Sequence, residues 1–215
     1  MSKLNKIKYE SQFGQDEWVI KNVFNHKKNG YFIDCGAGCP VINSNTYVLE
    51  KYFDWSGVAI DINMGWRRQR PKCSKVKALL SDKPNMFEKI VPGGGTTGIL
   101  NAASNRHIAT NVEANGWHLM PTVTLTQVLD AVDAPPFIDF FSLDVEGHEL
   151  SVLKGLDATK YTIDTLCIEA IPPHREGRGG FGMEIKRDLE EWLESEGYVN
   201  LKAKIPSDTI WQKRV

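Results

Sequence analysis

Residues 140–149 read Phe-Phe-Ser-Leu-Asp-Val-Glu-Gly-His-Glu, an apolar run that ends in three carboxylates and one imidazole. An isolated carboxylate is costly to bury in the middle of a strand, because it loses its hydration there. Asp144 is therefore expected at the carboxyl end of a strand, where open α/β sheets hold their ligands. This segment is the first candidate functional site of the chain.

Outward from this segment, apolar runs of strand length alternate with amphipathic segments of helix length. Strands are expected at residues 31–35, 58–62, 76–80, 138–145 and 165–170. Helices are expected at residues 45–53 and 125–132, and over a late segment around Leu189. Such alternation is typical of a parallel sheet that is covered by helices on both faces.

Local signals mark the ends of several of these elements. Thr124 and Gln127 have the spacing of a capping box, in which each side chain satisfies a free amide of the other residue. The late helix is indicated by apolar residues at helical spacing, namely Ile185, Leu189, Trp192 and Leu193. Gly197 suits a left-handed cap after it, and residues 198–205 and 209–213 are expected to pair as a terminal hairpin.

Two segments, residues 84–121 and 172–182, show no regular pattern and contain glycine-rich runs. We expect both to be loops. They follow strand ends, so they are either lids over a site or plain flexible connectors.

The bulk properties describe an ordinary globular chain of 215 residues, with 41% hydrophobic and 25% charged residues. We expect one domain over residues 1–215, with residues 1–30 as a helical segment that packs on the ligand-binding side. The 26 Lys and Arg residues nearly balance the 27 Asp and Glu residues, and the net charge of -1 provides no global field for nucleic acid or an anionic membrane.

No apolar segment approaches the roughly 20 residues that span a bilayer, and no apolar stretch of a secretory leader follows the first lysines. We therefore expect a cytoplasmic protein with no membrane insertion and no nucleic-acid partner, and the oligomeric state is left open. The four cysteines, at positions 35, 39, 73 and 167, lack the spacing of a zinc site and are expected to be reduced thiols.

The first expected strand leads into residues 34–40, Asp-Cys-Gly-Ala-Gly-Cys-Pro. Glycines let the backbone turn tightly and approach a ligand closely. Val41 stands where a dinucleotide fingerprint requires glycine, so a nicotinamide cofactor is disfavoured. Asp61, at the end of the second strand, is placed to accept both ribose hydroxyls of an adenosine, and Asp82, after the third, to receive the adenine amine. A turn role is the alternative for each of these two carboxylates.

Several of these motifs together resemble the FkbM family of S-adenosylmethionine-dependent methyltransferases. They are Ser-Gln-Phe-Gly-Gln-Asp at residues 11–16, Phe-Ile-Asp-Cys-Gly-Ala at 32–37, Ser-Asn-Thr at 44–46, Thr-Leu at 124–125, Ser-Leu-Asp-Val-Glu-Gly-His-Glu at 142–149 and Leu-Lys-Gly at 153–155. The resemblance covers nearly the whole chain, and the motif at 142–149 is the most specific part of it.

The resemblance implies an α/β, Rossmann-like class I methyltransferase fold with a mostly parallel seven-stranded sheet and helices on both faces. It also implies S-adenosyl-L-methionine as the cofactor and, as the acceptor, a hydroxyl of a sugar or of a natural product. Asp34, Gly36 and Gly38 would line the methionine side of the cofactor. Its other expected contacts are Asp61 with Ile62 at the ribose, Ser81 with Asp82 at the adenine, and Asn45, Thr46, Gln12 and Gln15 at the methionine carboxylate or closing the pocket.

A sugar hydroxyl has a pKa far above 7, so it must lose its proton to a base as it attacks the methyl group. The catalytic candidates are His148, Asp144 and Glu146, and the ordinary pKa of His148 suits this role. The alternative is that His148 is only hydrogen-bonded structure. A second version of the mechanism uses a divalent ion, Mg²⁺ or Mn²⁺, held by Asp144 and Glu169.

Other features leave different functions open. The basic run at residues 67–72, with Lys75 and Lys77, is either a phosphate or nucleic-acid patch or the solvated face of a helix. Candidates for contacts to an acidic acceptor or a sugar ring are His174, Arg175, Arg178, Trp66, Trp117 and His118. The alternatives to a sugar O-methyltransferase are a nucleic-acid or natural-product methyltransferase, and a non-catalytic ligand-binding module on the same scaffold.

Overall fold

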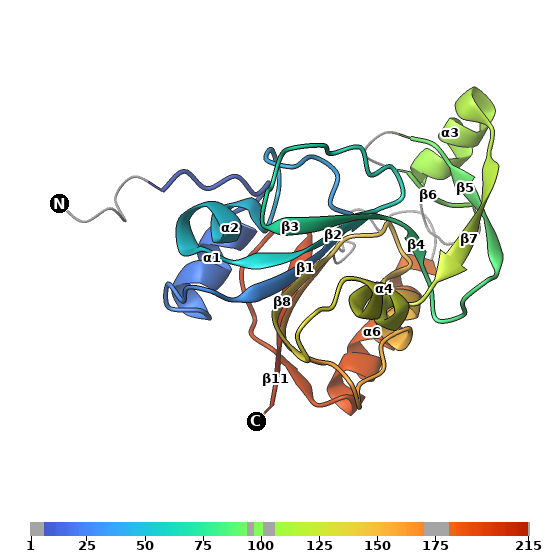
Figure 1. Ribbon diagram of the computed structural model, residues 1–215. Coiled ribbons are helices and arrows are strands. Elements are labelled where there is room, and N and C mark those ends of the chain that lie inside the picture. The colour runs from blue at the N-terminus through green and yellow to red at the C-terminus, as the bar shows by residue number, and fades with distance from the viewer. Residues whose placement is uncertain (1–6, 94–96, 101–105, 170–180, 215) are drawn as a thin grey trace.

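The structure is a computed structural model that describes residues 7–93, 97–100, 106–169 and 181–214 (Figure 1). Within these residues the larger sheet has seven strands in the order β10-β11-β9-β8-β1-β2-β3. Their bounds are β10 (Tyr198–Asn200), β11 (Asp208–Lys213), β9 (Thr162–Glu169), β8 (Phe137–Leu143), β1 (Tyr31–Cys35), β2 (Ser56–Asp61) and β3 (Cys73–Lys77). All neighbours pair in parallel except β11, which is antiparallel to both β9 and β10. The expected Rossmann-like sheet is confirmed.

The direction of winding reverses between β1 and β8. From β1 the chain continues to β2 and β3 on one side, whereas from β8 it continues to β9 on the other. Cys35 at the end of β1 lies opposite Leu143 at the end of β8, so the turns that follow both strands leave the sheet side by side. In open α/β sheets this switch point is where ligands bind.

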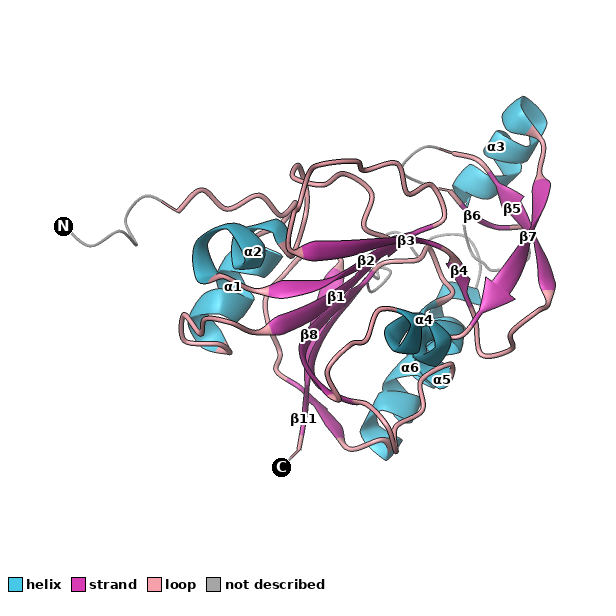
Figure 2. Ribbon diagram, in the orientation of Figure 1, coloured by secondary structure: helices cyan, strands magenta, loops and turns pink. Residues whose placement is uncertain are grey.

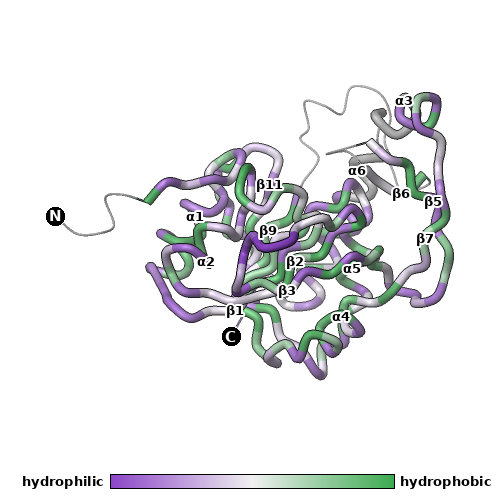
Figure 3. The backbone as a smooth tube through the Cα atoms, turned by 45° about the horizontal axis from the view of Figure 1, so that its top comes forward, coloured by the Kyte–Doolittle hydropathy of each residue, from purple (hydrophilic) through white to green (hydrophobic). Residues whose placement is uncertain are grey.

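Side chains alternate along each strand, so the sheet has two apolar faces. Different helices cover the two faces (Figure 2), and Figure 3 shows the hydropathy of each residue along the backbone. Helices α1 (Gln15–Asn22) and α2 (Tyr47–Phe53) cover one face. Helices α4 (Leu125–Ala131), α5 (Glu149–Lys154) and α6 (Phe181–Ser195) cover the other. In β1, Phe32 packs toward α1 and α2, while Ile33 and Cys35 pack toward α4 and α5.

A smaller sheet follows β3 and has the strand order β4-β7-β5-β6 among the described residues. Its strands are β4 (Leu79–Leu80), β7 (His118–Val123), β5 (Phe87–Val91) and β6 (Gly98–Ile99), and helix α3 (Arg106–Asn115) lies between β6 and β7 in the chain. The expectation that residues 84–121 form only a loop is therefore wrong. These strands bury a small cluster around Leu79, Ile90 and Ile99 and leave Phe87 and Leu119 exposed, so their hydrophobic pattern is weak.

Most other expected elements occur, with ends shifted by a few residues. The strand expected at 76–80 is wrong as a single unit, because β3 ends at Lys77 and β4 begins at Leu79 in the other sheet. The capping box is present: Thr124 Oγ1 accepts a hydrogen bond from the Gln127 amide at 3.2 Å, and Gln127 Oε1 accepts one from the Thr124 amide at 2.9 Å. Gly197 has the expected left-handed backbone, with φ at 80°.

Arg70 is buried, although it belongs to the basic run for which the sequence left open a phosphate or nucleic-acid patch or the solvated face of a helix. Residues 67–72 form no helix, and the Arg70 side chain is 0% exposed in an ion pair with Glu50 of α2. Arg70 also donates hydrogen bonds to the Pro40 carbonyl, at 3.2 Å, and to the hydroxyls of Ser44, at 3.2 Å, and Thr46, at 3.0 Å. The guanidinium therefore ties the turn after β1 to α2.

We expect Arg70→Met to lower the free energy of unfolding by about 3–5 kcal/mol, because it leaves the Glu50 carboxylate buried without a partner. The matched control is Arg68→Met, which removes the same charge from an exposed side chain of the same run and should change stability by no more than about 0.5 kcal/mol. Urea denaturation followed by circular dichroism measures both. Equal losses in the two variants would show that the buried network does not stabilise the fold.

Candidate functional site

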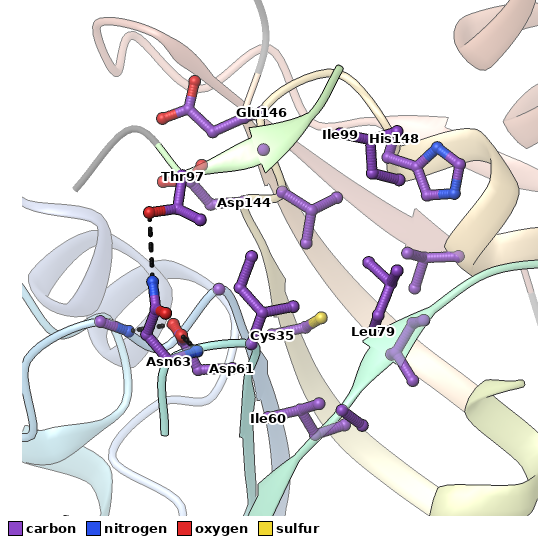
Figure 4. Close-up of a pocket in the computed structure, with 18 residues that line it drawn as sticks. Cys35, Ile60, Asp61, Asn63, Leu79, Thr97, Ile99, Asp144, Glu146 and His148 are labelled. Atoms are coloured by element: carbon purple, nitrogen blue, oxygen red, sulfur yellow. Dashed lines mark hydrogen bonds between the residues drawn. The ribbon is translucent and has the colours of Figure 1, made fainter. Parts of the chain in front are cut away.

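A cleft with about 730 Å³ of empty space lies at the carboxyl ends of β1, β2 and β8 (Figure 4). Its other wall comes from β4 and β6 of the smaller sheet and from the start of α5. Part of this space is open to solvent. The cleft is thus at the switch point of the larger sheet and is closed from the side by the smaller one.

The floor of the cleft is the turn after β1, which contains Gly36 and Gly38. Gly36 has φ at 77°, and a Cβ built there would lie 1.6 Å from the carbonyl oxygen of Asp144. Only glycine allows β1 and β8 to approach this closely where they end. The backbone of the turn therefore faces the cleft without a side chain in the way.

Asp61, at the end of β2, holds this turn in place. Its Oδ2 accepts a hydrogen bond from the Gly38 amide at 2.9 Å, and its Oδ1 accepts one from the Asn63 amide at 2.6 Å. An ionised carboxylate has about four lone-pair positions, so each oxygen can accept one further hydrogen bond. Because Asp61 lines the cleft, these positions are available to a pair of vicinal hydroxyls.

Beyond Asp61 the cleft is apolar. Apolar side chains from three strands line this part. They are Ile60 of β2, Ile62 directly after β2, Leu79 and Leu80 of β4, and Ile99 of β6. These side chains form a surface that suits a flat heteroaromatic ring better than a charged group. The Nδ2 of Asn63 donates a hydrogen bond to Thr97 Oγ1 at 3.1 Å and so joins the end of β2 to the smaller sheet at one side of this part (Figure 4).

One part of the cleft is acidic. Asp144, directly after β8, and Glu146 both line it. Asp144 is exposed and Glu169 is partly buried, and their carboxyl groups lie close enough to influence each other's pKa. Burial, with the Asp144 carboxylate as the next cause, raises the pKa of Glu169 to about 10, and desolvation by the surrounding protein also raises the pKa of Asp144.

The turn between Asp144 and α5 is held by Glu149. Its Oε1 accepts hydrogen bonds from the amides of Val145 and Gly147, both at 3.1 Å, and the residue is 4% exposed. Glu146, at φ 59°, and Gly147, at φ 98°, have left-handed backbones within this turn. Glu149 is thus a structural brace for the turn, and Glu146 and His148 face the cleft from it.

His148 is the N-cap residue of α5 and lines the cleft. Burial lowers the pKa of its imidazole, and the Asp82 carboxylate partly opposes that shift. Its Nε2 lies 3.4 Å from Ser81 Oγ, and Ser81 Oγ donates to Asp82 Oδ1 at 3.1 Å. The imidazole is therefore mainly neutral at pH 7, which is the protonation state of a general base.

Several residues expected at the cofactor do not line this cleft. Because side chains alternate along β1, Asp34 points toward α2, where it is buried and accepts a hydrogen bond from Thr46. Burial raises the pKa of Asp34, and the Arg70 charge opposes that shift. The Nδ2 of Asn45 donates to Ser142 Oγ at 2.9 Å. The side chains of Asp34, Thr46 and Asn45 therefore bond to other parts of the protein and are not among the residues that line the cleft.

Gln15 also lies away from the cleft lining. Its Nε2 donates to Asp208 Oδ2 at 2.8 Å, and its Oε1 accepts from the Phe13 amide at 2.8 Å. These bonds fasten the amino-terminal segment to β11.

Ser81 and Asp82 lie beside His148 and are not among the residues that line the cleft. The other expected site residues do line it: Gly36, Gly38, Asp61, Ile62, Asp144, Glu146 and His148.

The sequence reasoning missed Asn63, Thr97, Leu79 and Ile99 as residues of the cleft. No local signal marks them, because they meet only when the smaller sheet packs against β2.

Within the described ranges, no group of three or more His, Cys, Asp or Glu side chains is placed to hold a metal ion. His174, Arg175 and Arg178 lie outside the described residues.

No helix in the described part of the chain has both the length and the apolar character needed to cross a membrane.

Trp66, one of the expected sugar-stacking residues, donates its indole N–H to the Gly38 carbonyl at 2.8 Å. Trp117 is about half exposed on the smaller sheet, with the Lys89 ammonium 4.5 Å from its ring centroid.

Comparison with known proteins gives two findings and one absence. A solved structure from Plasmodium falciparum, of a protein named as a ribosomal RNA methyltransferase, superposes with a TM-score of 0.48 and 11% sequence identity, over 96% of this chain and 97% of that one. No curated protein sequence matches this chain at a significant level. The methyltransferase FkbM domain matches residues 34–199, which include the turn after β1, Asp61 and the acidic part of the cleft. This chain therefore belongs to the FkbM methyltransferase family.

Proposed function

We propose that this protein is an O-methyltransferase that transfers a methyl group from S-adenosylmethionine to a hydroxyl of a sugar in a glycan or glycoside. The family implies S-adenosylmethionine as the donor. The observation that carries the proposal is the set of side chains that line one cleft: the glycine turn with Asp61, an apolar wall, the carboxylates of Asp144 and Glu146, and the imidazole of His148.

The residues present fit the cofactor. Asp61 can accept the two ribose hydroxyls with the lone pairs that Gly38 and Asn63 leave free. The apolar wall around Leu79 and Ile99 fits the adenine ring, and Gly36 leaves room for a close backbone approach. When bound, the cofactor supplies a methyl group on a positively charged sulfur, which the negative charge at Asp144 and Glu146 favours electrostatically.

The residues in the acidic part of the cleft act on the acceptor. His148 is mainly neutral at pH 7 because burial lowers its pKa, so it can receive the proton of an acceptor hydroxyl. Asp144 and Glu146 can accept hydrogen bonds from neighbouring hydroxyls of the same sugar and orient it. We propose catalysis in which His148 takes the acceptor proton without a divalent ion; Mg²⁺ or Mn²⁺ held by Asp144 and Glu169 is the alternative, which a chelator tests.

We propose no nucleic-acid partner. The chain has a net charge of -1. In the basic run at residues 67–72, two of the positive charges are paired with carboxylates. Arg70 is buried on Glu50, and Lys72 pairs with Asp54. Three positive charges of this region stay exposed, those of Arg67, Arg68 and Lys77. Three such charges are fewer than the roughly 6–10 phosphate contacts of a tight nucleic-acid binder.

The direct test supplies isotope-labelled S-adenosylmethionine with a panel of sugar glycosides, RNA and aromatic natural products, and locates the label by NMR. We expect a new methyl ether on a sugar hydroxyl, with turnover unchanged by a chelator. Label found only in RNA or in a sugar-free product would overturn the acceptor class. Cofactor binding without transfer to any acceptor would favour a non-catalytic binding module.

Asp61→Ala should weaken calorimetric binding of S-adenosylmethionine at least about tenfold, because hydrogen bonds to a charged group contribute about 1.5–3 kcal/mol. Asp61→Asn keeps one acceptor oxygen and should lose less affinity. Asp188→Ala removes a carboxylate from the exposed surface of α6 and serves as the control for net charge. Unchanged affinity in Asp61→Ala would rule out contact with the ribose.

The pH profile of kcat/KM should rise through an acidic limb whose midpoint lies below the ordinary His pKa of about 6.5, since burial favours the neutral imidazole. Activity is present above that pKa and is lost as the pH falls through it. His148→Ala should remove this limb and lower kcat by about 10²–10⁴-fold with little change in cofactor affinity. His26→Asn, a change beyond the end of α1, should keep the wild-type profile.

A further inference from the structure

Three polar side chains from two distant parts of the chain meet at the edge of the cleft. His148 comes from the start of α5, and Ser81 and Asp82 follow β4 of the smaller sheet. The Nε2 of His148 is 3.4 Å from Ser81 Oγ, a long contact of the kind that tightens when an active site fills. Ser81 Oγ is in turn 3.1 Å from Asp82 Oδ1.

The direction of these hydrogen bonds follows from counting protons. A serine hydroxyl has one proton, and the ionised Asp82 carboxylate can only accept. We assign the Ser81 proton to the hydrogen bond with Asp82, and with that assignment the Ser81 oxygen accepts the Nε2–H of His148. A neutral imidazole has a single N–H, so Nδ1 is left with a free lone pair.

The backbone holds Ser81 firmly at this position. Its amide donates to the Val123 carbonyl at 2.9 Å, and the residue is 7% exposed. A Cβ at Gly155, the C-cap of α5, would lie 2.6 Å from the Ser81 carbonyl oxygen. The loop after β4 and helix α5, whose N-cap is His148, are thus packed together at van der Waals distance.

We propose that Ser81 and Asp82 are positioning residues that hold His148 in the tautomer with its proton on Nε2, so that Nδ1 is the atom that accepts the acceptor's proton. The structural part of this proposal concerns the imidazole alone, and its catalytic consequence rests on the function proposed above. In that reaction the acceptor O–H bond breaks and its proton goes to Nδ1. The acceptor oxygen bonds to the methyl carbon, whose bond to sulfur breaks with the electron pair staying on sulfur.

The charges around His148 agree with this role. Asp82 faces the imidazole from the smaller sheet and favours the imidazolium that forms when Nδ1 takes up the proton. On the same turn as His148, the Glu149 carboxylate is occupied by the amides of Val145 and Gly147. Asp144 and Glu146 line the cleft itself, where the acceptor would lie. Asp82 is therefore the carboxylate that acts on the Nε2 side through Ser81.

The test is long-range ¹H–¹⁵N NMR of the full-length protein with ¹⁵N-labelled histidine and no cofactor, in which His148→Gln assigns the resonance. We expect protonated Nε2 and unprotonated Nδ1 in the wild type. Ser81→Ala should yield a mixture of tautomers. Asp82→Ala frees the Ser81 hydroxyl to donate to Nε2 and should shift the imidazole toward the Nδ1–H tautomer. Ser81→Thr should restore the wild-type spectrum, and Ser74→Ala on β3 should leave it unchanged.

In methyl transfer, Ser81→Ala and Asp82→Ala should lower kcat at least about tenfold, a part of what a general base supplies, with calorimetric cofactor affinity unchanged. A wild-type Nδ1–H tautomer, or a tautomer unaffected by Ser81→Ala, overturns the proposal. Loss of cofactor affinity in Asp82→Ala without a tautomer change would assign Asp82 to the adenine instead. Because the NMR readout needs no acceptor, failure of the proposed function is distinguishable from failure of this inference.

Discussion

The site depends on one close contact, that between the backbone of Gly36 and the carbonyl oxygen of Asp144. A side chain at Gly36 would overlap that oxygen, so the two strand ends can meet only if this residue has no Cβ. Their contact places the turn after β1 and the turn after β8 at the same edge of the sheet. The glycine turn and the carboxylates of Asp144 and Glu146 are neighbours for this reason.

The turn after β1 is held from behind by charges that are buried but paired. Arg70 bonds Glu50 and the loop between Pro40 and Thr46, and Thr46 bonds Asp34. Removing charges from water is costly, and such a network is stable only when nearly every donor and acceptor is satisfied. Its benefit is rigidity, because a turn fixed before a ligand arrives loses less conformational freedom on binding.

The smaller sheet turns an open edge into a cleft. Leu79 and Ile99 supply apolar walls, Thr97 bonds Asn63 at the end of β2, and Ser81 reaches His148. The larger sheet therefore supplies the acids and the glycine turn, whereas the smaller sheet supplies the enclosure and the contact that orients the imidazole. Chemistry at the boundary of the two sheets needs both to be folded.

Local sequence was enough for the elements whose signals are local: the buried strand β1 was predicted at its observed ends, and the capping box at Thr124 formed as expected. The family and the position of Asp144 after a strand also followed from contiguous motifs. Only the tertiary structure decided the face that Asp34 occupies, the burial of Arg70 and the pairing of Ser81 with His148. Each of these depends on contacts between residues far apart in the chain. The identity and spacing of a side chain do not show which distant residue it will contact after folding.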